Sequence, residues 1–321
     1  MKDKILLTGA FGNVGQRTLK ELLKREYNVI CFDLKNEKNT KILDELLEEG
    51  IFMTIWGDIT EEEDVNKAIK GIDCIIHLAA IIPPMSEKNP DLAYKVNVEG
   101  TKNLITAATS LPNKPRFIMA SSVSVYGITM DLEPPVRIDD PLNPSDTYSK
   151  TKVESEQTLK ESGLPWIILR LGAVSVEEFQ FDFDPLLFEM PLEQRIEFIS
   201  SLDCGIAFTN AIDLTETNKI FLIGGGSGCQ LLERDFIEGL FDAFGLGMLP
   251  DEAFKKPKKK EDWFYIDWLD TEESQKKLKY QNESFQEYVE RLKETFRWKR
   301  LGIKLISPLA KRVLLKKSPY Y

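Results

Sequence analysis

The sequence has 321 residues, with 42 Lys and Arg against 52 Asp and Glu and a formal net charge of −10. This acidic balance argues against nucleic acid as a partner. A single histidine, His77, gives poor support to metal sites built from histidine clusters and to a serine–histidine triad.

The first expected element is a short buried strand at residues 4–8, which runs into a glycine-rich turn and then a helical pattern. We expect Gly9 to permit the tight turn, Gly12 to let the backbone approach a pyrophosphate and Gly15 to allow close packing of helix on strand. An ordinary turn is the alternative. The order of strand, glycine turn and helix predicts a dinucleotide site, which Phe11, Asn13 and Val14 complete.

Asp33 ends the next expected strand, residues 28–33, eighteen residues beyond Gly15. A carboxylate at this place accepts hydrogen bonds from both hydroxyls of an adenine ribose and repels a 2′-phosphate. The sequence therefore predicts NAD rather than NADP as the cofactor. NADP is the alternative, because the positively charged Lys35 lies only two residues after Asp33.

Strand and helix patterns alternate from here to a strand expected at 166–171, which predicts a parallel α/β sheet. Pro83 and Pro84 interrupt the longest apolar stretch, which is far shorter than a membrane span, and the first apolar run is too short for a signal peptide. The four cysteines show no Cys-x-x-Cys spacing, so we expect reduced structural thiols. These features predict a cytoplasmic protein.

Tyr148 and Lys152 lie four positions apart in the stretch 145–152. On a helix these two side chains share a face, and an ammonium beside a phenol favours the phenolate. A phenol of pKa ~10 needs roughly three units of depression to exchange protons at neutral pH. The pair predicts an acid–base group and its tuner, with a solvated helix face as the alternative.

Four further segments occur in a fixed order, at residues 57–60, 73–80, 96–101 and 120–127. Together with the Gly-x-x-Gly-x-x-Gly spacing at 9–15, they resemble the extended short-chain dehydrogenase/reductases of the NAD-dependent epimerase/dehydratase family. The resemblance covers about the first 172 residues. It implies further cofactor contacts from Asp58, Ile59, Leu78, Ala79, Ala80 and Asn97.

The resemblance also implies the fold, a Rossmann-type doubly wound parallel sheet of the α/β class with a smaller C-terminal lobe. We expect an NAD-binding domain at residues 1–172, to which elements around 196–225 return. A substrate-binding lobe is expected at 173–295, followed by a basic amphipathic tail at 296–321.

Three residues match the catalytic set of the family. Tyr148 would exchange a proton with a substrate hydroxyl or carbonyl, and Ser122 would hydrogen-bond the same oxygen. Lys152 would bind the nicotinamide ribose and lower the pKa of the tyrosine. Ser121 and Ser124 rank below Ser122 because the family places the hydroxyl at the spacing of Ser122.

The family pattern fails on the substrate side. Dehydratases carry an acidic pair where this chain has Val123 and Ser124, so water elimination is disfavoured. Sugar-nucleotide epimerases have a diphosphate-binding asparagine where this chain has Ala173. The family also has a later arginine, and Arg195 is about one residue away from the position of that arginine in the sequence. Substrate contacts are expected from Ser124, Tyr126, Ala173 and Arg195.

We therefore expect an NAD(H)-dependent oxidoreductase acting on a secondary alcohol or ketone. A nucleotide-sugar epimerase with tightly held NAD is the alternative. A nonenzymatic NAD-binding regulator is a third reading, against which the intact Ser122, Tyr148 and Lys152 argue. Relatives pair through the helices that span 91–110 and 148–161 here, so we expect a homodimer, with Leu104, Ile105 and Ala108 available to that surface. The alternative is that these three residues only cover the sheet.

Residues 296–321 hold eight basic residues and no acidic one, whereas the remainder of the chain has a net charge of −18. Their pattern predicts two short amphipathic helices, broken at Ser307-Pro308, that suit an anionic membrane surface. The alternative is packing against the acidic body or a partner subunit.

Two other segments have no clear assignment. We expect residues 177–191 to form a cap that packs its aromatic side chains. Residues 224–228 look like a second phosphate loop, and the alternative is a joint between a strand and the following helix.

Overall fold

The computed structural model describes residues 3–175 and 186–321. Its main sheet has seven parallel strands in the spatial order β3-β2-β1-β4-β5-β6-β9. This order reverses between β1 and β4, as in a doubly wound sheet, so the predicted Rossmann-type fold is confirmed. The strands are β1 (Lys4–Thr8), β2 (Asn28–Asp33), β3 (Met53–Trp56), β4 (Cys74–His77), β5 (Arg116–Ser122), β6 (Trp166–Leu171) and β9 (Lys219–Ile223).

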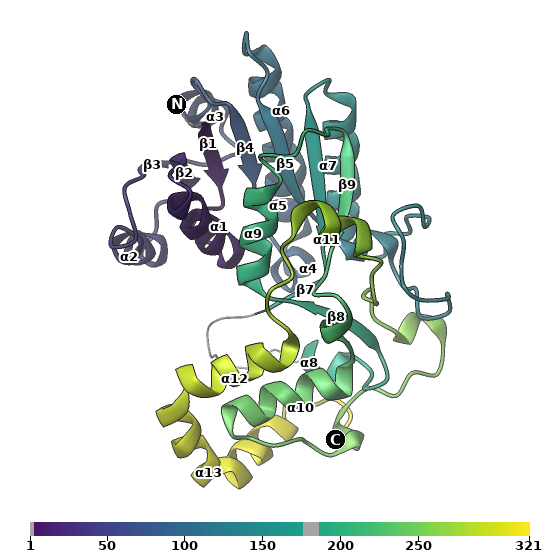
Figure 1. The fold of residues 1–321 in the computed structure, drawn as a ribbon. Helices are drawn as coiled ribbons and strands as arrows, with labels where there is room; N and C mark the ends of the chain where they lie inside the picture. Colours follow the sequence, from purple (N-terminus) through teal and green to yellow (C-terminus); the bar gives the residue numbers. More distant parts are fainter. Residues whose placement is uncertain (1–2, 176–185) are drawn as a thin grey trace.

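Alternation of apolar side chains builds a core on each face of this sheet. In β6, Ile167 and Leu169 join one cluster while Ile168 joins the other, because successive side chains of a strand point to opposite faces. Figure 1 shows helices covering both faces. One side has α1 (Asn13–Lys24), α2 (Glu37–Leu46) and α9 (Ser201–Asn210); the other has α3 (Glu62–Ala68), α6 (Thr101–Ser110) and α7 (Thr147–Glu161).

A second, three-stranded sheet of order β10-β8-β7 begins the C-terminal lobe. β9 and α9 thus pack with the main sheet, whereas β8 belongs to the lobe. Helix α11 (Glu272–Leu278) lies beside β9 and α9. The lobe contains β7 (Ala173–Val174), β8 (Arg195–Ile199), β10 (Gln230–Leu232), α8 (Leu186–Glu189), α10 (Glu233–Phe244), α12 (Phe285–Thr295) and α13 (Arg297–Leu315).

The prediction of two short helices in the tail was wrong, because α13 is one helix of 19 residues with Pro308 inside it. Proline removes one intrahelical hydrogen bond. Ile303 and Leu314 are nevertheless buried in the same cluster on either side of the proline, so packing holds the two halves in line. Within the described ranges, no helix is long and apolar enough to span a bilayer.

The expected aromatic cap falls largely outside the described residues, and this includes Phe179, Phe181 and Phe183. Phe188 is described. Its ring is fully buried and lies 5.7 Å from the ring of Phe254, within the core of the lobe.

Candidate active site

The β1–α1 turn has the geometry that the glycine pattern predicts. Gly9 has φ +65°, and a Cβ atom there would lie 2.7 Å from the backbone nitrogen of Ala79. A Cβ on Gly15 would lie 2.1 Å from the carbonyl oxygen of Gly9. Gly12 is the N-cap residue of α1 and has no side chain that could accept a hydrogen bond from the first N–H groups of the helix. The first turn also contains no acidic residue. The helix N-terminus therefore offers backbone N–H groups to an anion.

Asp33 lies at the carboxyl end of β2, directly against this turn. Its carboxylate accepts hydrogen bonds from the backbone N–H of Phe11 at 2.9 Å and of Leu34 at 2.8 Å, and from the Asn39 amide at 3.2 Å. Burial raises the pKa of Asp33, and these donors oppose the rise. The ring of Phe11 lies 5.2 Å from that of Trp56, at the end of β3.

The remaining predicted cofactor residues lie around the same edge of the sheet. Asp58 caps the turn after β3 by accepting from the Thr60 N–H at 2.8 Å, and Ile59 is buried. Leu78 and Ala79 donate backbone N–H groups to the Thr8 hydroxyl, each at 3.3 Å, and Ala80 follows them. Thr8 thereby fixes the loop after β4 beside the glycine turn.

Asn97 joins this loop to α7. Its side chain accepts from the Ile81 N–H at 2.7 Å and donates to the Ile81 carbonyl at 2.9 Å and to the Thr151 hydroxyl at 3.0 Å. It lies in a π-helical turn, Lys95–Gly100, a rare geometry that is frequent at functional sites. Thr151 in turn donates to the carbonyl of Tyr148 at 2.7 Å.

Tyr148 and Lys152 share a face of α7, as their spacing predicts. The Lys152 Nζ atom lies 5.6 Å from the centroid of the Tyr148 ring and donates to the Ala120 carbonyl at 2.9 Å. Burial lowers the pKa of Lys152 to about 8, against the opposing charge of Glu156. Asp146 caps α7 in a capping box with Ser149, which fixes where the Tyr148 turn begins.

The expected depression of the tyrosine pKa does not arise from the side chains of the chain itself. Burial raises the pKa of Tyr148 well above its ordinary value, and the Asp146 carboxylate adds to the rise. The reason is that removal from water penalises the charged phenolate.

The three serines after β5 have different hydrogen-bond partners. Ser121 donates to the buried Glu156 carboxylate at 2.7 Å, which commits its hydroxyl to the interior. The Ser122 hydroxyl accepts from the Ser124 backbone N–H at 3.2 Å and from the Ser124 hydroxyl at 2.9 Å. Ser122 is partly exposed, whereas Ser121 and Ser124 are buried. Ser124 therefore orients the hydroxyl of Ser122.

The four expected substrate residues are mostly engaged within the chain. The Tyr126 hydroxyl is buried and accepts from Arg170 at 2.6 Å. Arg195 forms a two-pronged ion pair with Asp267, at 2.6 and 2.8 Å. Ala173 lies in β7, beside Phe198 of β8.

Two groups that pattern reading missed support α7. Glu156 and Arg170 form a buried ion pair, with bonds of 2.9 and 2.7 Å. Glu87, on α4 (Met85–Lys88), accepts from the backbone N–H of Thr147 at 3.1 Å and of Tyr148 at 3.2 Å. The position of Glu156, four residues after Lys152 and so on the same face, was the available sign.

Two other candidate groups are structural. His77 lies between the hydroxyls of Thr8 and Thr101, at 2.7 and 2.8 Å, and burial lowers its pKa to about 3. In the 224–228 loop, the Gly226 N–H donates to the buried Glu197 carboxylate at 3.0 Å. A carboxylate of the chain itself therefore occupies this loop. The loop joins β9 to the short strand β10, and the expected helix begins only after β10, at Glu233.

Comparisons with known proteins agree with this geometry. A sequence model described as the NAD dependent epimerase/dehydratase family matches residues 5–182. A 3-beta-hydroxysteroid dehydrogenase of Mycolicibacterium neoaurum is 36% identical over 163 residues, which are 48% of this chain and 42% of that protein. A UDP-glucose 4-epimerase of Lactobacillus helveticus is 30% identical over 174 residues, 52% of this chain and 50% of that protein. The match therefore spans half or less of these two relatives.

Among solved structures, a UDP-glucuronic acid 4-epimerase from Bacillus cereus, in complex with UDP-glucuronic acid and NAD, superposes with a TM-score of 0.76. The two sequences are 23% identical, and the superposition covers 92% of this chain and 99% of the other. At that identity the likeness shows a shared fold, which includes the C-terminal lobe.

Proposed function

The chain belongs to the NAD-dependent epimerase/dehydratase family, and from this premise we propose that it is an NAD(H)-dependent oxidoreductase acting on a secondary alcohol or ketone. The observation that carries the proposal is the placement of Ser122, Tyr148 and Lys152 at one end of β5 and α7. Lys152 lies beside the Tyr148 ring and bonds the Ala120 carbonyl of β5, the strand that ends at Ser122, and this supports a shared role for the three residues.

The fit of the chain to NAD rests on the β1–α1 turn. Side chains on Gly9 or Gly15 would collide with backbone, and the uncapped N-terminus of α1 suits a pyrophosphate. Asp33 supplies the carboxylate that excludes a 2′-phosphate. NAD, when bound, accepts or supplies the hydride. Phe11, Asp58, Ile59 and the loop at 78–80 would surround its adenosine and pyrophosphate portions.

Each catalytic side chain has a distinct role in this proposal. Tyr148 moves a proton to or from the substrate oxygen, and Ser122, oriented by Ser124, hydrogen-bonds that oxygen. Lys152 keeps a positive charge beside the phenol and is held there by the Ala120 carbonyl. Asn97 fixes the distance between the loop after β4 and α7.

The substrate class is proposed from what the substrate side contains. The partners of Arg195 and Tyr126 are protein groups, and Ala173 has no polar side chain to meet a diphosphate. These features, with the name of the hydroxysteroid dehydrogenase relative, favour an apolar alcohol or ketone. The fold shared with a UDP-glucuronic acid 4-epimerase keeps a nucleotide-sugar epimerase as the second candidate.

Turnover assays test the proposal. NAD reduction and NADH oxidation are followed across secondary alcohols, ketones and nucleotide sugars, and the active substrate is then used with the Tyr148→Phe variant. We expect turnover to fall by at least about a hundredfold with NAD affinity retained, the usual contribution of general acid–base catalysis. Tyr27→Phe, whose hydroxyl bonds Asp213 far along the chain, is the matched control. Near-normal turnover of Tyr148→Phe would exclude the mechanism.

Retention of the cofactor separates the two candidates. An epimerase regenerates its NAD in every cycle, so NAD that stays bound through purification supports the epimerase. NAD that exchanges freely, with net NADH formed from an alcohol, supports the dehydrogenase.

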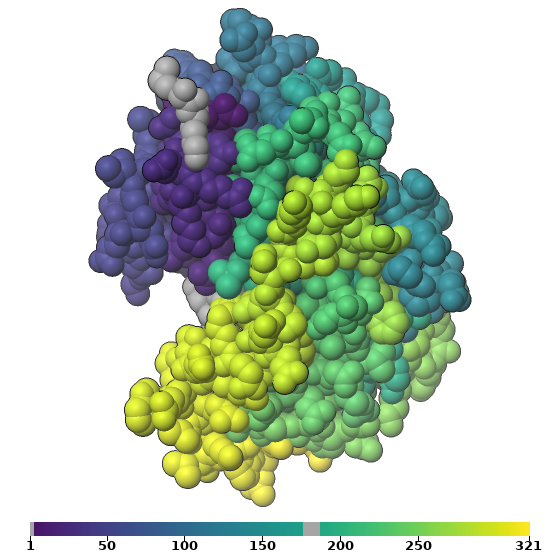
Figure 2. All heavy atoms as spheres, viewed as in Figure 1, coloured from purple at the N-terminus to yellow at the C-terminus, as the bar shows by residue number. Residues whose placement is uncertain are grey.

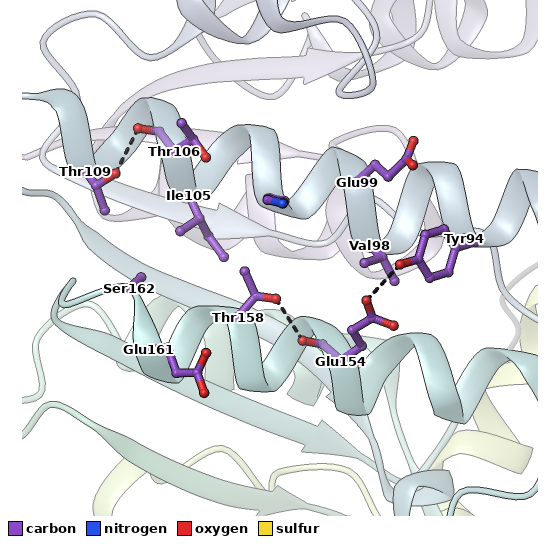
Figure 3. Close-up of a pocket in the computed structure, with 11 residues that line it drawn as sticks. Tyr94, Val98, Glu99, Ile105, Thr106, Thr109, Glu154, Thr158, Glu161 and Ser162 are labelled. Atoms are coloured by element: carbon purple, nitrogen blue, oxygen red, sulfur yellow. Dashed lines mark hydrogen bonds between the residues drawn. The ribbon is translucent and has the colours of Figure 1, made fainter.

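We also propose a cytoplasmic homodimer with peripheral membrane contact through residues 296–321. Figure 3 shows a groove, here called the α6–α7 groove, between α7 and the helical segment 90–110 that ends in α6; Tyr94, Val98 and Thr158 project into it. Leu104 and Ala108 are fully buried against the sheet, so they are not available to this surface, and Ile105 lies at its floor. Light scattering at micromolar concentration should give a dimer mass that Thr158→Arg lowers; a monomeric wild type contradicts the dimer.

A further inference from the structure

Helix α13 has two faces of opposite character, and the inner one fixes it to the lobe. Ile303 and Leu314 are buried in a cluster with residues of α10 and its following loop. The Ser307 hydroxyl donates to the Leu246 carbonyl at 2.7 Å, and Lys311 donates to the Met248 carbonyl at 2.9 Å. The helix is therefore a built part of the lobe, and its inner face is already covered.

The outer face of α13 exposes six large apolar side chains. Leu305 is 86% exposed, Trp298 79% and Leu309 63%. The others, each more than half exposed, are Leu301, Ile306 and Val313. Most follow one another at intervals of three or four residues, so they form a continuous stripe along the helix. A soluble surface rarely gathers so many large apolar groups in one place, and such a patch marks a site of association.

Exposed cations, here called the basic rim, lie along the same helix as the apolar stripe. Lys304, Arg312 and Lys316 are exposed, and none of them forms an ion pair within the part of the chain that the structure describes. Arg297 and Lys299 flank Trp298 at the start of the helix. Residues 296–321 carry a net charge of +8, against −18 for the remainder, so this surface belongs to a net positive segment of an acidic protein.

We propose that the outer face of α13 docks on an anionic lipid bilayer as an interfacial helix. The apolar stripe would enter the boundary between head groups and acyl chains while the basic rim meets lipid phosphates and carboxylates. Trp298 suits this boundary, where amphipathic rings concentrate. A second copy of the chain is the poorer occupant, because pairing two outer faces would bring two basic rims together.

The place of α13 in the molecule allows this contact. Figure 1 shows the helix at the end of the lobe remote from the seven-stranded sheet, and in Figure 2 its atoms form one edge of the molecule. The glycine turn and the α6–α7 groove belong to the part of the molecule that is built on the seven-stranded sheet. Docking through α13 therefore leaves both the nucleotide site and the proposed dimer surface clear of the bilayer, and it does not depend on the reaction catalysed.

Vesicle sedimentation of the full chain tests the apolar stripe. The probe is vesicles of phosphatidylcholine with phosphatidylserine, beside vesicles of phosphatidylcholine alone. We expect wild type to sediment with the anionic vesicles at low salt, and Leu305→Glu/Leu309→Glu to remain in the supernatant. Because both side chains point to water, the double variant should keep its circular dichroism spectrum and melting temperature. Leu47→Glu/Ile51→Glu, at exposed apolar positions of the nucleotide-binding half, should sediment like wild type.

The basic rim is tested separately with Lys304→Gln/Arg312→Gln/Lys316→Gln. Each near-surface cation contributes about 1 kcal/mol, so losing three should weaken binding to anionic vesicles by about a hundredfold. The control, Lys41→Gln/Lys70→Gln/Lys219→Gln, removes the same charge elsewhere on the surface and should bind within a few-fold of wild type. Added salt should weaken wild-type binding, since the attraction is screened.

The proposal is overturned if wild type ignores anionic vesicles at low salt, or if the Leu305→Glu/Leu309→Glu variant binds them equally. Light scattering without lipid tests whether a second copy of the chain, instead of a bilayer, binds the outer face. If this double variant lowers the mass of the wild-type assembly, the outer face is an interface between copies of the chain and the bilayer assignment is wrong. Sedimentation measures vesicle binding without any measurement of turnover. A protein that binds vesicles but has no activity would therefore refute the proposed reaction and leave the lipid contact of α13 supported.

Discussion

Replacing Glu156 by leucine should strongly destabilise the protein. The carboxylate is fully buried and accepts two hydrogen bonds from Arg170, whose own side chain is 2% exposed, one from Ser121 and one from the partly exposed Lys160. Leucine fills a similar volume but leaves the guanidinium buried with the Tyr126 hydroxyl as its remaining described partner. Removing one member of a buried pair typically costs about 3–5 kcal/mol, because the other charge stays desolvated.

Urea titration and thermal melting measure this cost. At about 2 °C per kcal/mol for a chain of this size, Tm should fall by roughly 6–10 °C. The control is Gln157→Leu, one residue further along the same helix and exposed to solvent, which should stay within about 0.5 kcal/mol of wild type.

A double variant tests the reasoning itself. In Glu156→Leu/Arg170→Met both charges are gone, and such replacements of buried pairs are often neutral. The double variant should therefore be clearly more stable than Glu156→Leu alone. A single variant within about 1 kcal/mol of wild type, or a double variant less stable than the single one, would refute the argument that desolvated charge sets the cost.

Three further predictions concern the nucleotide site and its histidine. Asp33→Ala should narrow a preference for NADH over NADPH in direct titrations; tighter binding of NADPH by wild type would contradict the assignment. Lys152→Ala should weaken NAD binding as well as turnover, and unchanged NAD affinity would argue against contact with the cofactor. His77 has a pKa of about 3 in the folded chain, so as pH falls below about 6.5 only the unfolded state takes up the proton and stability is lost. By pH 5 the contribution of His77 to this loss is about 2 kcal/mol. Burial raises the pKa of Glu197 to about 7 and that of Asp203 to about 6, and these carboxyl groups add stability as pH falls. The measured quantity is therefore the difference between wild type and His77→Gln in urea titrations at pH 7 and pH 5, which should be about 2 kcal/mol; equal pH dependence of the two proteins would contradict the argument.

The sheet was predictable because its determinants are local. Apolar runs such as 4–8 and 166–171 are short and bounded by turn residues, and each became a buried strand. The glycine turn was equally accessible, since only glycine tolerates the φ of Gly9 and the contact at Gly15. The spacing of Tyr148 and Lys152 fixed their shared face before any tertiary contact was known.

What the sequence did not reveal depends on contacts between distant segments. Arg195 was a candidate for the substrate until the fold placed Asp267 beside it, 72 residues further along the chain. The tail was expected to break at Pro308, but burial on both sides of the proline continues the helix. The sequence pattern alone does not show which face of such a helix packs against the rest of the protein. This packing distinguishes the inner face of α13 from its outer face.

The two perturbed groups of α7 together favour one direction of proton transfer in the proposed reaction. With a pKa of about 8, Lys152 is about nine-tenths charged at pH 7, whereas burial keeps the Tyr148 phenol protonated. A neutral phenol beside an ammonium is ready to give its proton to a carbonyl oxygen, which is the step that reduction of a ketone requires. Oxidation of an alcohol needs the phenolate, and the charges of the chain alone disfavour it. In the proposed reaction, oxidation would therefore need additional positive charge beside Tyr148 to favour the phenolate.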